Sequence, residues 1–158
     1  MTNEEINKYA TLYRGTVINK MITLERTVDF YLAHYFSSNA AKEKELMLLI
    51  FGNERITFGN KVDILSHLCK SKSVDLSENY PTLLKDLRFL IEQRNILAHF
   101  VIIDDAISEH LPDGTIELMK LKNEGSRLHF NTEDFDLAVS KIEDLKKYIE
   151  SSFGYHTS

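Results

Sequence analysis

The sequence has few of the residues that interrupt or cross-link a chain: one cysteine, two prolines, six glycines and no tryptophan in 158 residues. Because Cys69 is the only cysteine, no intrachain disulfide can form, which is typical of a reducing compartment. The scarcity of proline and glycine favours long helices over a many-stranded sheet. No apolar run approaches the roughly 18 residues that a membrane-spanning helix needs, so we expect none.

The composition is that of a globular protein, with 43% apolar and 27% charged residues. Its length predicts a single helical domain over residues 1–158. Nineteen basic and 24 acidic residues give a net charge of −5, which argues against a broad duplex-DNA footprint but allows a small basic cleft. The first ten residues, MTNEEINKYA, are acidic and polar, unlike a signal peptide, so we expect a cytoplasmic protein.

Helical periodicity dominates four segments. Residues 3–36 repeat apolar side chains at steps of three and four, which predicts one long helix. Shorter helices are expected over 40–51, before Gly52, and over 57–70. A fourth is expected over 81–100, with Pro81 in its first turn, where a missing N–H is tolerated. The stripe of the first helix consists of Val17, Met21, Leu24, Val28, Tyr31 and Tyr35.

The pattern changes after residue 111. Residues 112–114, Pro-Asp-Gly, are a turn signal, and 115–122 and 127–130 predict two short strands joined through 123–125. Asn131 or Thr132 then caps a final helix, whose acidic first turn suits the positive end of the helix dipole. The expected fold is mainly α: an antiparallel four-helix-type bundle with a small β-hairpin before the last helix.

The helix expected over 81–100 carries an arginine where a core residue belongs. On a helical wheel Arg94 falls in the middle of the apolar face, and burying an unpaired guanidinium costs several kcal/mol. Glu25 and Asp29 of the first helix are candidate partners for it. Asn95 and His99 lie one turn apart on the flank, and a lone helical histidine is usually structural. Spacing alone therefore favours a structural role for these residues.

A second apolar stripe lies on the far side of the same helix, where a surface helix would be polar. It consists of Phe89, Gln93, Ile96 and Phe100. Two apolar faces indicate a helix that is covered on both sides, and a second copy packed across a two-fold axis would cover the bare one. We therefore expect a homodimer, with Asn95 and His99 at the edge of its interface.

Residues 94–99, Arg-Asn-Ile-Leu-Ala-His, resemble the R-N-x-x-x-H signature of the HEPN superfamily. The upstream segment 56–65, ITFGNKVDIL, is similar to the helix that precedes this motif in many HEPN-like proteins, including relatives of the mannitol-operon repressor. The likeness covers residues 17–153. One position departs from it: some HEPN toxins have a tyrosine two residues after the histidine, where this chain has Val101.

The resemblance implies a metal-independent endoribonuclease that acts on RNA at a homodimer cleft and needs no cofactor. It makes Arg94 and His99 the catalytic pair and Asn95 the polar residue that follows the arginine. Histidine titrates near neutral pH, which suits proton transfer at the 2′-hydroxyl or the leaving oxygen, and arginine offers fixed positive charge to the transition state. Arg88 and Lys61 are predicted to form a local basic cleft that binds the substrate.

Such a ribonuclease suits a toxin or a phage-defence component, with an antitoxin or a regulatory protein as partner. Because HEPN proteins include catalytically silent members, the alternative is a non-catalytic dimeric regulator or adaptor related to the mannitol-operon repressor. In that case Arg94 and His99 would hold the dimer interface.

Other chemistry is poorly supported by the sequence. His67 and Cys69 are two residues apart on a helix, so their side chains diverge and make poor joint metal ligands. The remaining histidines show no zinc spacing: His110, His129 and His156. We expect no metal site.

Overall fold

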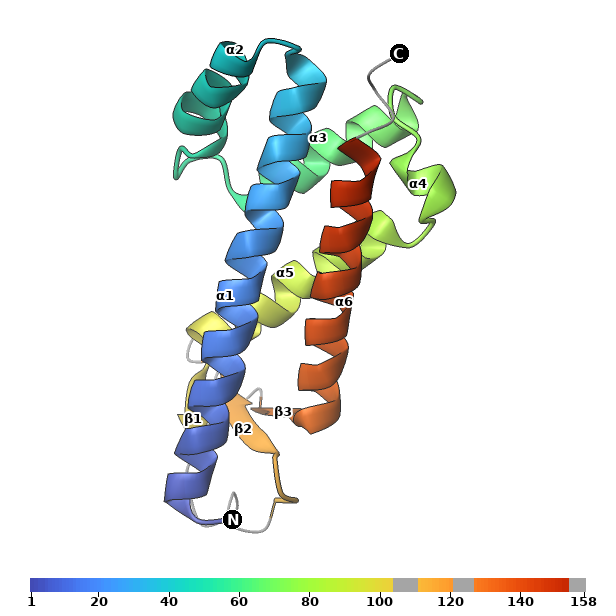
Figure 1. Cartoon of the computed structure of the whole chain (residues 1–158). Coiled ribbons are helices and arrows are strands. Elements are labelled where there is room, and N and C mark those ends of the chain that lie inside the picture. Colours follow the sequence, from blue (N-terminus) through green and yellow to red (C-terminus); the bar gives the residue numbers. More distant parts are fainter. Residues whose placement is uncertain (104–110, 121–126, 154–158) are drawn as a thin grey trace.

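The two longest helices begin with the same local signal and lie side by side. The computed structural model describes residues 1–103, 111–120 and 127–153. Helix α1 spans Asn3–Phe36 and α6 spans Thr132–Ser151. Each starts with a capping box, at Thr2 and Asn131, in which cap and third helical residue satisfy each other's backbone N–H. The two helices run in the same direction (Figure 1).

The remaining helices are shorter. The helix predicted over 40–51 is present as α2 (Ala40–Glu45) followed without a break by a π-helix, η1 (Leu46–Phe51). Helix α3 spans Phe58–Lys70, a one-turn helix α4 spans Leu76–Asn79, and α5 spans Leu83–His99. The sequence did not predict α4. Helix α5 starts two residues later than predicted, because Pro81 precedes the cap rather than entering the first turn.

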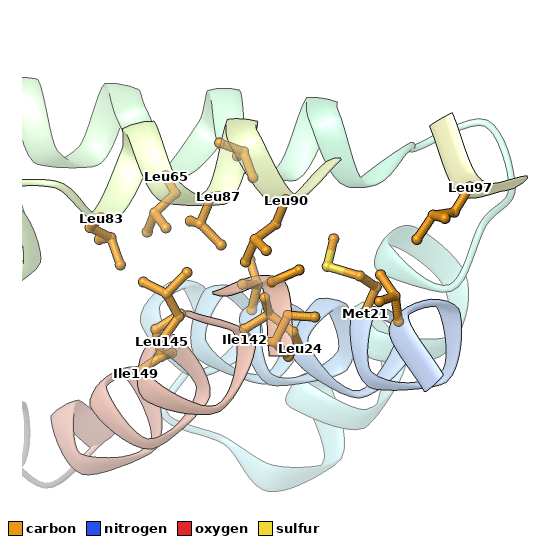
Figure 2. Packing of buried hydrophobic residues seen from close by; sticks show 14 of the residues in the cluster. Met21, Leu24, Leu65, Leu83, Leu87, Leu90, Leu97, Ile142, Leu145 and Ile149 are labelled. Carbon is orange, nitrogen blue, oxygen red and sulfur yellow. The ribbon is translucent and has the colours of Figure 1, made fainter. Parts of the chain in front are cut away.

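Helix α5 lies at the centre of the packing. It crosses behind α1 and α6 at a steep angle in Figure 1, and Figure 2 shows it between these two helices and α3. Leu83, Leu87 and Leu90 point from α5 toward α1 and α6, and all three are fully buried. The prediction of a mainly helical fold is confirmed. The antiparallel four-helix arrangement is not, because α1 and α6 are parallel.

A three-stranded antiparallel sheet lies between α5 and α6 in the sequence. Its order is β1 (Val101–Ile103), β2 (Ile116–Met119) and β3 (Arg127–Phe130). The predicted pairing of the last two strands is confirmed, with Leu118 opposite Leu128. The sequence missed β1, which follows α5 after a single residue. The predicted turn over 123–125 lies outside the described residues.

One tyrosine ties the start of α1 to the segments around the sheet. The buried hydroxyl of Tyr13 donates to the carbonyl of Gly114 over 2.7 Å and lies 3.0 Å from Oγ1 of Thr132. Gly114 has a φ of +77°, and a Cβ added there would lie 2.3 Å from Thr132 Oγ1. The turn signal at 112–114 therefore contains a glycine that both the backbone conformation and the space require.

Gly114→Ala is expected to lower the free energy of unfolding by about 2–3 kcal/mol. The left-handed conformation costs an L-residue about 1–2 kcal/mol, and displacing Thr132 breaks a hydrogen bond worth about 1 kcal/mol. Gly15→Ala is the matched control, because no described atom lies within 4 Å of its added Cβ and helical alanine is favoured by about 0.5–1 kcal/mol. The midpoint of urea unfolding should fall for Gly114→Ala and rise for Gly15→Ala. Equal shifts would contradict the requirement for glycine at position 114.

Candidate active site

The three polar residues of the R-N-x-x-x-H segment are exposed on the last two turns of α5. Arg94, Asn95 and His99 are all exposed, whereas Leu90 and Leu97, on the stripe above and below Arg94, are fully buried. The prediction that Arg94 sits inside the buried apolar face is therefore wrong. At the level of Arg94 the neighbouring elements leave an open groove, and a long charged side chain reaches water through it.

This first groove, the Arg94 groove, has a volume of about 680 Å³. It lies between the middle of α1, the segment that joins η1 to α3, and α5. Its polar lining consists of Glu25, Arg26, Asp29, Asn53, Glu54, Thr57, Lys61, Arg94 and Asn95. Its side-chain charges are three acidic and three basic, so the groove offers positive charge only locally, around Arg26 and Arg94.

A buried ion cluster forms one wall of the Arg94 groove. Lys61 Nζ lies 2.6 Å from Glu25 Oε1 and 2.8 Å from Asp29 Oδ1, and the Lys61 side chain is only 3% exposed. Burial raises the pKa of Asp29, although the hydrogen bond from Lys61 opposes this. Glu25 and Asp29, the candidate partners of Arg94, thus bind Lys61 instead. Lys61, the predicted substrate-binding residue, joins α3 to α1.

The second groove, the His99 groove, has a volume of about 650 Å³. It lies between α5 and the sheet, with Lys120 and Leu128 on the sheet side and Arg88 and His99 on the helix side. Nη2 of Arg88 lies 2.8 Å from Oδ1 of Asp63, and both side chains are more than half exposed. Such surface pairs contribute about 0–1 kcal/mol, so Arg88 can exchange Asp63 for another anion at little cost.

Arg94 and His99 face different grooves because of their spacing. Five residues on an α-helix correspond to about 140° around the axis and about 7.5 Å along it. Asn95 lines both grooves, as do Ile91 and Gly59, so the grooves adjoin along this ridge of α5. Arg94 Nη1 donates to Asn95 Oδ1 over 3.1 Å, and Asn95 is one turn before His99. The three side chains therefore form a continuous polar strip.

Both proposed catalytic groups are available in the described part of the chain. There, Arg94 forms no ion pair with a carboxylate, and the imidazole of His99 forms no hydrogen bond or ion pair. A free guanidinium fork can bind a phosphate through two parallel hydrogen bonds. An exposed imidazole can accept or donate a proton. The strip thus carries the groups that metal-free phosphodiester chemistry needs.

The second apolar stripe of α5 is partly covered within the chain itself. Phe89, Gln93, Ile96 and Phe100 are all half-buried, and the three apolar members pack against the core. The guanidinium of Arg14 in α1 also donates to the Phe100 carbonyl. Because the chain itself covers part of this stripe, the stripe needs a second copy less than its sequence suggested. The homodimer stays a prediction.

Two groove cations were not singled out from the sequence. Arg26 is exposed on α1 and lines the Arg94 groove, and Lys120 follows β2 and lines the His99 groove. Arg26 has a weak sequence signal, because it lies one turn after Ile22 on a face that the apolar stripe does not use. Lys120 has none, since only the pairing of the strands brings it to α5.

The other candidate residues stay apart. On α3, His67 is exposed and Cys69 is buried, as their spacing predicted. His129 on β3 lies 3.6 Å from Glu117, and His110 and His156 lie outside the described residues. Within 1–103, 111–120 and 127–153, no three histidine, cysteine or acidic side chains are grouped to hold a metal ion. No helix in these ranges has the length and hydropathy to cross a membrane.

Comparison of the chain with protein-family models, with curated proteins and with solved structures finds no match. The likeness to the HEPN superfamily therefore rests on the six-residue motif, its place near the end of α5, and the segment 56–65. The first two residues of that segment, Ile56 and Thr57, precede α3, and both line the Arg94 groove.

Proposed function

We propose that this chain is a metal-independent endoribonuclease of the HEPN type, which cleaves RNA at a cleft between two copies of the chain. Its scaffold is a four-helix-type bundle of α1, α3, α5 and α6. Arg94 and His99 are its catalytic residues, Asn95 supports them, and Arg88 contacts the substrate. The biological setting that fits this activity is a toxin or a phage-defence component, restrained by an antitoxin or a regulatory protein.

The observation that carries the proposal is the exposed strip of Arg94, Asn95 and His99. An arginine with a structural role is normally paired with an acidic side chain. Among the described residues, however, the side chain of Arg94 binds only the side chain of Asn95. The nearest acidic cluster, Glu25 and Asp29, is occupied by Lys61. An arginine and a histidine that have no acidic partner in 1–103, 111–120 and 127–153, along two adjoining grooves, favour binding of an anion over a structural role.

The chemistry follows from the two side chains. One His99 takes the proton of a ribose 2′-hydroxyl, and the 2′ oxygen forms a bond to the adjacent phosphorus. The bond from phosphorus to the 5′ oxygen breaks, and a second His99, protonated, gives that oxygen its proton. Arg94 binds the non-bridging oxygens, whose negative charge increases in the transition state. The products are a 2′,3′-cyclic phosphate and a free 5′-hydroxyl.

The angle between Arg94 and His99 supports a site shared by two copies. Within one helix the side chains diverge by about 140°, so they do not converge on one phosphate. In a two-fold dimer, Arg94 of one copy meets the His99 groove of the other, and both histidines reach the same strand. Asn95, which lines both grooves, would then lie at the centre of the contact.

The test is cleavage of single-stranded RNA by the purified chain in the presence of EDTA. Arg94→Ala is expected to reduce the rate at least about 100-fold, the usual loss when a group that stabilises transition-state charge is removed. Lys85→Ala is the control, because it removes one exposed positive charge from the same helix outside both grooves. It should retain the rate of the parent protein.

The non-catalytic alternative predicts another result. A silent dimeric regulator related to the mannitol-operon repressor would not cleave RNA. Arg94→Ala would then lower the free energy of unfolding by more than about 2 kcal/mol, the scale of a broken buried contact. Expression in a host cell adds a simple readout: growth arrest that Arg94→Ala relieves favours the ribonuclease, and growth unaffected by the parent protein favours the regulator.

A further inference from the structure

Four exposed large apolar side chains, including the two most exposed among the described residues, lie together at the end of the molecule away from the sheet. In η1, Leu48 is 66%, Leu49 69% and Ile50 44% exposed, and Phe36 at the end of α1 is 53% exposed. We call these four residues the η1 patch. α2 and η1 pack against the last part of α1 at the edge of the molecule (Figure 1). Three consecutive exposed apolar residues in a helix indicate a binding surface.

The backbone of η1 fixes this exposure. The six residues of η1 are all apolar, LMLLIF, and one helix face cannot bury them all against α1. The N–H of Gly52 donates to the carbonyl of Met47 over 2.8 Å, which closes the wide π turn. As a result Phe51 turns inward and is 3% exposed, while Leu48, Leu49 and Ile50 stay outside. Such π turns are rare and often occur at functional sites.

The patch contains a hollow as well as protruding side chains. A groove of about 330 Å³ lies between α1 and the α2–η1 helix, and its apolar lining consists of Phe36, Leu46, Leu49 and Ile50. Leu48, the neighbouring side chain on η1, protrudes outside this lining. A surface with a ridge beside a groove can pack on a copy of itself, since in a two-fold interface each ridge enters the other groove.

The charges at the rim of the groove are of opposite sign. Lys42 and Glu45 both line it, three residues apart on α2. The other two charged residues of α2, Glu43 and Lys44, do not line the groove, and Glu43 lies 3.2 Å from His34 of α1. A basic or an acidic peptide would require a rim of one sign. A rim with one lysine and one glutamate instead complements its own two-fold image, in which Lys42 meets Glu45 of the second copy.

We propose that a second copy of this chain binds the η1 patch in a two-fold symmetric interface. Leu48 of each copy fills the groove between Phe36 and Ile50 of the other, and Lys42 and Glu45 close the rim. This interface is separate from the cleft at α5. The inference does not depend on RNA cleavage, because the patch contains neither Arg94 nor His99.

Sedimentation equilibrium of the full chain across micromolar to submillimolar concentrations tests the proposal. Leu49→Glu is expected to raise the dissociation constant of this association at least about 30-fold, because it places a carboxylate in the apolar centre. Leu12→Glu is the control: Leu12 is a 50% exposed leucine on α1 outside the patch, so the mass should not change. Circular dichroism of both variants establishes that the fold is kept.

A charge exchange then identifies the occupant. Lys42→Glu or Glu45→Lys alone should weaken association by about three- to tenfold, and the double variant Lys42→Glu/Glu45→Lys should restore it. Restoration supports a second copy, since no other partner would change its charge at the same time. A monomeric parent protein, an unchanged mass for Leu49→Glu, or a double variant weaker than either single one would each overturn the proposal. The last two results leave the proposed RNA cleavage untouched, whereas a monomeric parent protein would also contradict the cleft between two copies at α5.

Discussion

His99→Ala is expected to reduce RNA cleavage at least about 100-fold while leaving the free energy of unfolding within about 0.5 kcal/mol of the parent value. A positioned proton-transfer group usually contributes 100-fold to 10,000-fold in rate, whereas an exposed side chain contributes little to stability. The His99 side chain is exposed at the end of α5 and has no hydrogen bond to any described residue. The substitution is therefore expected to lower the rate of proton transfer while leaving the packing of the core unchanged.

The matched control for this variant is His67→Ala. His67 is also an exposed helical histidine, near the end of α3, and it lines neither groove of the candidate site. Initial rates on a fluorescent single-stranded RNA, with EDTA present, should be unchanged for this variant. Cleavage by His99→Ala at the parent rate would eliminate the proposed mechanism. A large loss of stability for His99→Ala would favour a structural role instead.

Lys61→Met is expected to lower the free energy of unfolding by about 3–5 kcal/mol, the largest stability effect among the variants considered. Methionine keeps the volume of the side chain but leaves two carboxylates without their cation, and breaking a buried pair from one side costs about this much. Asp29 is 8% exposed, so water cannot replace Lys61 there; Glu25, 32% exposed, is less affected.

The effect of Lys61→Met should depend on pH in a defined direction. Burial already raises the pKa of Asp29 above its ordinary value of 3.8, and removal of Lys61 removes the hydrogen bond that opposes this. The folded variant then binds a proton at pH values where the unfolded chain has released it. Its stability accordingly falls as pH rises through this window, so the loss is greater at neutral pH than near pH 4.

Urea unfolding of Lys61→Met and Lys20→Met at both pH values measures this. Lys20 pairs with Glu143 at the surface, where both side chains are at least one-third exposed, so its replacement should change stability by no more than about 1 kcal/mol. Similar losses for the two variants would mean that the buried cluster contributes no more than a surface pair.

The sequence was most informative where local signals determine local structure. The span of α1 was predicted to the residue, because its stripe of apolar positions and the break after Phe36 are both local. The start of α6 likewise follows from the cap at Asn131. The missed strand β1 is three residues long and continues directly from the apolar end of α5. Only its pairing with β2, whose partner residues are 14 to 18 positions away, makes it a strand.

The candidate site shows a similar division. The segment of Arg94, Asn95 and His99 was found from the sequence, because it is a local pattern on one helix. The helical wheel nevertheless placed Arg94 in the core, since a wheel assumes that neighbours cover the whole apolar face. The burial of Lys61 was missed for a related reason: its partners Glu25 and Asp29 are 36 and 32 residues away along the chain.

The direct passage from α5 into β1 has a mechanical consequence. Phe100 alone separates His99 from Val101, and β1 is hydrogen-bonded along its length to β2. A connection of one residue is too short to absorb a displacement, so the backbone of His99 cannot shift unless β1 shifts with it. Opening of the sheet edge and fraying of the final turn should therefore be a single event, with common rates of amide hydrogen exchange for Ile102 and for the last residues of the helix.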